Sequence, residues 1–187
     1  MAVQDRLYTV QDIAHFPNHK DEILELHNGV VTAVPSPNLT HSALSAWFAH
    51  LLWAFIVDRK LGGYITGADC VVELNRYNTR IPDMAYLSPT ILQCQNGNSF
   101  IKGGPDLVME ITLPPLTPDA MQQRVGEFLS AGTRLVWIVN RHTRTVDVYR
   151  KDGERTVVSG SGMLEGYEVL PGFKVSLETV FNPFQNT

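Results

Sequence analysis

Two almost uninterrupted apolar stretches limit most strongly how this chain can fold. Leu107 to Ile111 is apolar except at Glu110, and Leu135 to Val139 is apolar throughout. Strands without polar alternation are typical of sheets that are covered on both faces. We therefore expect both stretches to lie in a central sheet flanked by helices.

Glu110 is the exception in the first stretch, and a lone buried carboxylate is costly in free energy. Asp83 follows Pro82 at the start of the strand that we predict before it. If these two strands pair, the two carboxylates converge. Hard oxygen ligands on adjacent strands, completed by water and a phosphate, suit Mg²⁺ or Mn²⁺ better than zinc. Such an ion would also offset the cost of burying Glu110.

The rest of the chain alternates helical and strand patterns, with the dipeptide Asn28-Gly29 favouring a tight hairpin turn. Helices are predicted from the Thr9 cap through Ile13 and Ala14, from Leu44 to Gly62-Gly63, from the Thr117 cap to Gly132, and over 177–181. Strands are predicted over 22–26, 30–34, 64–74, 81–87, 106–112, 135–139, 145–150, 156–158 and 167–170. A polar turn is expected around 75–79.

Composition and charge narrow the class of protein. The 187 residues are 44% hydrophobic and 18% charged, which predicts one globular domain over 1–187. The net charge of -4 does not indicate a general affinity for nucleic acid or membranes, so any basic site is local. The apolar stretch 43–57 is too short for a span and is interpreted as a buried helix. Two cysteines without metal or redox spacing, and no export leader, favour a cytoplasmic protein.

Several strings in this order are similar to a known family. They are Arg80-Ile81-Pro82-Asp83-Met84-Ala85-Tyr86, Gly104 to Ile111, Glu127 to Val139, Glu25-Leu26-His27-Asn28-Gly29 and His41. Together they resemble the Uma family of bacterial putative restriction endonucleases, in the PD-(D/E)xK nuclease superfamily. The resemblance implies an α/β (α+β) fold with a restriction-endonuclease-like core. In that fold a mixed central sheet is flanked by helices and carries an N-terminal hairpin and a C-terminal antiparallel extension.

The resemblance also implies a function, namely Mg²⁺-dependent hydrolysis of DNA phosphodiester bonds. Asp83 and Glu110 match the metal ligands of the family, and Glu25 matches an acidic residue that adds a ligand directly or through water. Superfamily members usually place a lysine two residues after the second acid, where this chain has Thr112. In the Uma pattern the lysine commonly comes from the next helix, and Arg124 stands at that position.

Arg124 departs from the family in its chemistry as well as its identity. It flanks the apolar stripe of its helix, so it could point toward the end of the strand that carries Glu110. A guanidinium supplies charge and a fork of donors for phosphate, but it is a poor proton acceptor. Arg124 is therefore predicted to stabilise phosphate charge rather than to act as a base.

Each candidate also has a structural interpretation. Asp83 is also typical of a turn, Glu110 of a strand edge that faces solvent or pairs with an arginine, and Glu25 of a hairpin acid in water near Lys20 or another cation. His41 is expected to be a helix-start residue, and Arg124 can pair with Glu127. Asp106, which opens the strand of Glu110, is expected to have a structural role.

A group of basic residues in the late hairpin region is a candidate phosphate surface, although charged hairpin faces are commonplace. Its members are Arg134, Arg141, His142, Arg144, Arg150, Lys151 and Arg155. Two hypotheses of different classes result. The first is a metal-dependent endonuclease, with a homodimer as the simplest way to cut both strands. The second is a catalytically impaired nuclease-fold protein that acts as a DNA-binding or assembly module.

Overall fold

The computed structural model describes residues 6–13, 15, 23–34, 38–95, 97, 100–112 and 117–184. Its largest sheet, among these residues, has six strands. In spatial order they are β11 (Arg155–Val158), β10 (Thr145–Arg150), β9 (Leu135–Asn140), β8 (Leu107–Ile111), β6 (Met84–Leu87) and β3 (Tyr64–Thr66). β8 and β9 are parallel and the other neighbours are antiparallel, so the sheet is mixed, as expected.

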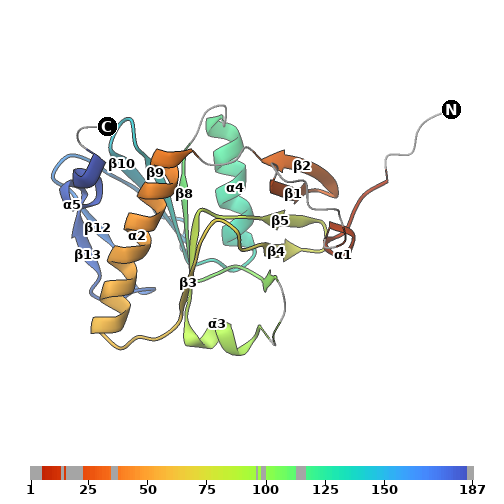
Figure 1. The fold of residues 1–187 in the computed structure, drawn as a ribbon, viewed down its shortest axis with the longest axis horizontal. Coiled ribbons are helices and arrows are strands. Elements are labelled where there is room, and N and C mark those ends of the chain that lie inside the picture. The colour runs from red at the N-terminus through yellow and green to blue at the C-terminus, as the bar shows by residue number, and fades with distance from the viewer. Residues whose placement is uncertain are drawn as a thin grey trace.

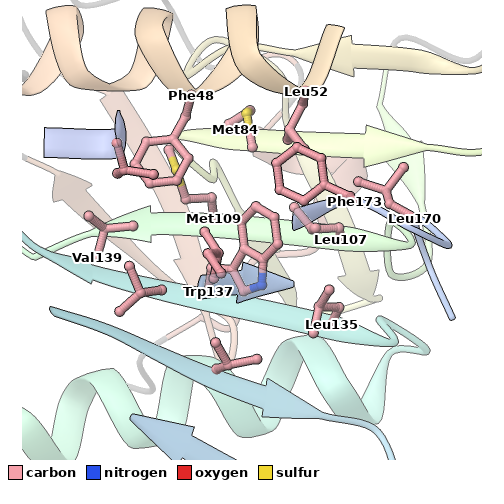
Figure 2. Packing of buried hydrophobic residues seen from close by; sticks show 14 of the residues in the cluster. Phe48, Leu52, Met84, Leu107, Met109, Leu135, Trp137, Val139, Leu170 and Phe173 are labelled. Carbon is pink, nitrogen blue, oxygen red and sulfur yellow. The ribbon is translucent and has the colours of Figure 1, made fainter. Parts of the chain in front are cut away.

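One face of this sheet packs against helix α2 (Leu39–Asp58). Figure 2 shows Phe48 and Leu52 of α2 above Met109 of β8 and Trp137 of β9. Trp137 is fully buried and its ring lies 6.4 Å from that of Phe48, centroid to centroid. The sheet's α2 face is therefore the main apolar core.

By length and composition α2 could also cross a membrane, alone among the helices of the described ranges. Its buried residues are His41, Leu44, Phe48, Leu52 and Ile56. The apolar ones lie at helical spacing and belong to the same core cluster as β8 and β9. This packing agrees with the buried core helix that was predicted.

The opposite face of the sheet packs against helix α4 (Pro118–Ser130). Val108 and Val136 from the sheet belong to one buried cluster with Val125 and Phe128 from α4. The helix begins as predicted, because the Thr117 side chain accepts a hydrogen bond from the Ala120 N–H and Pro118 occupies the first turn. Both faces of β8 and β9 are thus covered, which explains their unbroken apolar sequences.

The N-terminal hairpin consists of β1 (Ile23–His27) and β2 (Val30–Val34), with α1 (Val10–Ile13) before it. Asn28 and Gly29 both have positive φ, as a tight hairpin turn requires. The hairpin attaches to β5 (Asn78–Arg80), where the Leu26 N–H donates to the Thr79 hydroxyl at 2.8 Å. In Figure 1 it lies beside β4 and β5, at the end away from α5.

Several secondary-structure predictions were wrong or incomplete. The predicted strand 64–74 is divided into β3 and β4 (Val72–Asn75), which lie in different sheets and flank a turn in which the Cys70 N–H meets the Gly67 carbonyl. β4 pairs with β5 and with β7 (Ile101–Lys102), so the predicted polar turn at 75–79 is partly a strand. Helix α3 (Pro89–Gln93) was not predicted, although Ser88 caps it.

The predicted strand 167–170 is a turn, because the N–H groups of Val169 and Leu170 both donate to the Gly166 carbonyl. The strands lie on either side of it, as β12 (Met163–Glu165) and β13 (Lys174–Ser176). Helix α5 (Leu177–Phe181) follows as predicted and continues into η1 (Asn182–Phe184). Figure 1 places this C-terminal unit beside α2. The expected helix end at Ala14 and hairpin start at Glu22 lie outside the described residues.

Candidate active site

Asp83 and Glu110 are brought together by the pairing of β6 with β8. Met84 lies opposite Met109 in the antiparallel register, so Asp83 and Glu110 occupy the next facing position. The Asp83 Oδ2 atom accepts a hydrogen bond from the Ile111 N–H at 2.7 Å. The two strands therefore pair as the prediction required, which brings both residues to the same end of the sheet.

Glu110 lies on the α4 face of the sheet, and Arg124 reaches it from the middle of α4. The Arg124 Nε donates to Glu110 Oε1 at 2.7 Å. The same guanidinium binds Glu25 through both terminal nitrogens, at 2.7 and 2.8 Å, and donates to the Ile81 carbonyl at 3.2 Å. Arg124 therefore joins two carboxylates, rather than pairing with Glu127.

Glu25 enters the site because the N-terminal hairpin is anchored on β5. Glu25 is only 5% exposed, and its Oε1 atom also accepts from the Ile81 N–H at 2.7 Å. Arg80, on β5, donates to the Leu26 and Thr79 carbonyls and pairs with Glu127 at 2.6 Å. The cation that pairs most closely with Glu25 is thus Arg124. Arg80 and Arg124 together hold the N-terminal hairpin against α4.

The electrostatics of the site follow from this burial. Burial raises the pKa of Glu110 to about 8, with Asp83 and Glu25 acting in the same direction and Arg124 opposing them. Burial alone would disfavour the charged guanidinium, but Glu110 and Glu25 outweigh it and raise the pKa of Arg124. Arg124 thus stays a cation and cannot serve as a base, as the sequence predicted.

Asp83 is positioned by two residues of α2 whose role the sequence did not reveal. His41 is 4% exposed, and its Nε2 lies 3.0 Å from Asp83 Oδ2. The Nδ1 of His41 has no hydrogen-bond partner within the described part of the chain, which places the donated proton on Nε2. The Ser45 hydroxyl donates to the Asp83 carbonyl at 2.8 Å. A histidine at the start of the main core helix was the available signal.

The basic residues predicted as one cluster lie at opposite ends of the central sheet. Arg141, His142 and Arg144 are in the turn after β9, and this end of β9 lies beside Ile111 because the two strands are parallel. Arg134, Arg150, Lys151 and Arg155 lie at or near the other end. Only the first group is therefore at the end of the sheet that carries Glu110.

The carboxylates leave oxygen atoms that fit a hard divalent cation. Among the described residues, no hydrogen bond or ion pair reaches Asp83 Oδ1 or Glu110 Oε2. Mg²⁺ is usually held by one or two carboxylates together with water and phosphate oxygens, which matches this pair. No group of three or more His, Cys, Asp or Glu side chains in these ranges is arranged around a single metal position. Glu25 is bound by Arg124 instead, so its part as a ligand stays a prediction.

Comparisons with known proteins agree with this geometry. The family model described as "Uma2: Putative restriction endonuclease" matches residues 10–178. The chain therefore belongs to the Uma2 family, as its sequence motifs indicated. No curated protein matches it.

The structure is similar to the crystal structure of a putative nuclease of DUF820 from Anabaena variabilis ATCC 29413. The TM-score is 0.79 with 17% sequence identity, over 93% of this chain and 97% of that chain. At this identity the likeness concerns the fold, and it confirms the predicted restriction-endonuclease-like architecture.

Proposed function

We propose that this protein is a divalent-metal-dependent endonuclease that hydrolyses DNA phosphodiester bonds beside Asp83 and Glu110. The observation that carries the proposal is that two buried carboxylates, from β1 and β8, share one guanidinium, while Asp83 lies at the same end of the sheet beside Ile111. Within this network three carboxylates, those of Glu25, Glu110 and Glu127, pair with the two guanidinium groups of Arg80 and Arg124. Excess negative charge of this kind favours a divalent cation.

Each residue has a proposed part in the reaction. Asp83 and Glu110 would hold Mg²⁺ or Mn²⁺, which polarises the phosphodiester and lowers the pKa of an attacking water. His41 holds the Asp83 carboxylate, and Ser45 holds the Asp83 backbone carbonyl. Glu25 fixes the Arg124 guanidinium through two hydrogen bonds. Four of the five N–H groups of Arg124 have acceptors in the described ranges, so one is left to donate to a phosphate oxygen.

The surroundings of the site support DNA as the proposed substrate. Arg141 and Arg144 extend the same end of the sheet, where they would contact the phosphate backbone. We further propose that the protein works in the cytoplasm, and as a homodimer when it cuts both strands of a duplex.

A second candidate function is a DNA-binding or assembly module that has lost catalysis. It is favoured by the absence of lysine at both family positions. The Thr112 hydroxyl donates to the Val139 carbonyl, and Arg124 is held by two carboxylates. Under this alternative, DNA would bind without metal and remain uncut, and charge reversal at Arg141 and Arg144 would weaken binding.

Cleavage of supercoiled and single-stranded DNA with Mg²⁺ or Mn²⁺ tests the two functions. We expect the wild type to cut, Glu110→Gln to be inactive, and the control Asp147→Asn, on β10, to cut like the wild type. Arg124→Lys should cut faster if the missing lysine limits the reaction. Cutting by Arg124→Lys alone would identify a silenced site, and no cutting by any variant would overturn the endonuclease proposal.

A further inference from the structure

A groove of about 290 Å³ lies between α2 and the end of β3. Small side chains create the hollow, since Ser42, Ser45, Ala46 and Ala49 line one side and residues 65–68 line the other. The lining residues of α2 recur at helical spacing, so they form one face of the helix. Because β3 is an edge strand of the central sheet, the groove opens at that edge.

The groove is continuous with the candidate active site through two shared residues. His41 lines it and also contacts the Asp83 carboxylate at 3.0 Å. Ser45 lines it and also donates to the Asp83 carbonyl at 2.8 Å. Whatever occupies the groove therefore lies one residue away from a proposed metal ligand.

The chemistry of the lining indicates what fits. Apart from His41, no residue of the lining is ionisable, so the groove offers no counter-charge to a phosphate or to an acidic peptide. Its surface is mainly apolar, from Ala46, Ala49 and Ile65, with a hydroxyl group on Ser42. The volume lies at the lower end of the roughly 300–1,000 Å³ of small-ligand pockets. A single flat ring with polar edges matches this size and polarity.

We propose that the groove receives an unpaired nucleobase of the substrate, next to the phosphate that is cut. This inference rests on the proposed function, and it specifies the substrate class. In a duplex the bases are stacked and paired, so a base enters a side groove only from single-stranded or locally opened DNA. The protein then cuts DNA at unpaired positions, in single strands or where a duplex has opened locally, and the groove selects that state.

Two alanines of α2 allow a matched test. Ala46 lines the groove and Ala43 does not, and both side chains are exposed on the same helix. Leucine has nearly the same helix propensity as alanine, so neither Ala46→Leu nor Ala43→Leu should disturb the fold. Binding of a fluorescent oligothymidylate and of a blunt duplex would be measured by anisotropy with Ca²⁺ in place of Mg²⁺. Titration of Mn²⁺ by calorimetry would check that the metal site is intact.

We expect the wild type to bind the single strand more tightly than the duplex. Ala46→Leu should weaken single-strand binding about tenfold, because the leucine side chain fills the space of one base, with Mn²⁺ binding unchanged. Ala43→Leu should bind like the wild type. Equal affinities for the two variants, a preference for duplex, or no binding of either DNA would overturn the inference. Binding with this pattern but without cleavage in Mn²⁺ would uphold the groove and reject the nuclease activity.

Discussion

Strand β8 has a buried carboxylate near each end, and the two carboxylates differ in how they are satisfied. At one end Asp106 is 4% exposed and accepts from Arg134 through Oδ1 and from the Ser88 N–H through Oδ2. At the other end Glu110 is 6% exposed and bonds Arg124 through Oε1 alone. Two further acids, Asp83 and Glu25, also act on Glu110 and raise its pKa.

The difference separates a structural ion pair from a candidate site. Asp106 joins β8 to α3 and β9, and both its oxygens have protein partners, which agrees with the structural role expected for it. Arg134 is also 36% exposed at its side chain, so water shares its charge. The Glu110 end instead gathers more negative than positive charge in a buried place. An acid that is buried but incompletely satisfied is typical of a site that awaits a ligand.

The largest expected effect comes from removing the cation at each end. Arg124→Met leaves Glu25 and Glu110 without their guanidinium, which should cost about 3–5 kcal/mol in the free energy of unfolding. Arg134→Met should cost less, because its partner lies near solvent. Urea unfolding in EDTA would measure both. Mn²⁺ should restore part of the stability of Arg124→Met and none of that of Arg134→Met; an equal response would remove the distinction between the two ends.

The next largest effect is expected in the rate of DNA cleavage, which should depend on the Glu110 end of β8 and not on the Asp106 end. Asp83→Asn should slow DNA cleavage on the order of a hundredfold or more, since it removes a charge that acts on the reacting phosphate. Asp106→Asn should cut at the wild-type rate below its unfolding temperature. Initial rates on one plasmid substrate would measure the ratio. Loss of activity in Asp106→Asn at a temperature where it is fully folded would contradict the assignment.

In the free energy of unfolding the order should be reversed, so that the change at the Asp106 end has the larger effect. Asp106→Asn removes charged hydrogen bonds to Arg134, and we expect it to cost about 1.5–3 kcal/mol in the free energy of unfolding. Glu110→Gln keeps an acceptor for the Arg124 Nε and relieves the clustering of acids, so its stability should equal or exceed that of the wild type. Thermal unfolding of Asp106→Asn and Glu110→Gln without divalent metal would measure this difference in stability. A Glu110→Gln protein that is the less stable of the two would show that Glu110 is structural.

The last prediction concerns the dependence of stability on pH. The pKa of Glu110 in the folded state, about 8, lies above its ordinary value of 4.5. Between these values the folded state binds more protons than the unfolded state, so this group makes the protein lose stability as pH rises from 4.5 to 8. Glu110→Gln should flatten that decline when unfolding is followed by urea denaturation in EDTA. Parallel pH profiles of the two proteins would contradict the raised pKa.

Much of this arrangement followed from local patterns in the sequence. The continuous apolar strands predicted a sheet covered on both faces, and the order of the strands predicted that Asp83 and Glu110 would meet. The spacing of Arg124 from the apolar stripe of α4 predicted its direction toward Glu110. These features depend on periodicity and on neighbouring strands, which the sequence displays directly.

Other features depend on contacts between distant segments. Hydrogen bonds hold β1 against β5 and so bury Glu25. The groups on β5 that form these bonds are the side chains of Thr79 and Arg80, about fifty residues farther along the chain. His41 reaches Asp83 only because α2 lies across the sheet. The apolar segment 64–74 was predicted as one strand, but the turn at Gly67 sends its two parts into different sheets. Local strand propensity does not determine which distant segment a strand or helix packs against.

Calorimetric titration with Mn²⁺ tests the central claim most directly, namely that the Glu110 end of β8 is a cation site. It would compare the wild type, the double variant Asp83→Ala with Glu110→Ala, and Asp147→Asn as the control. The account predicts a saturable site in the wild type and the control that is absent from the double variant. Identical weak heats in all three proteins would contradict it.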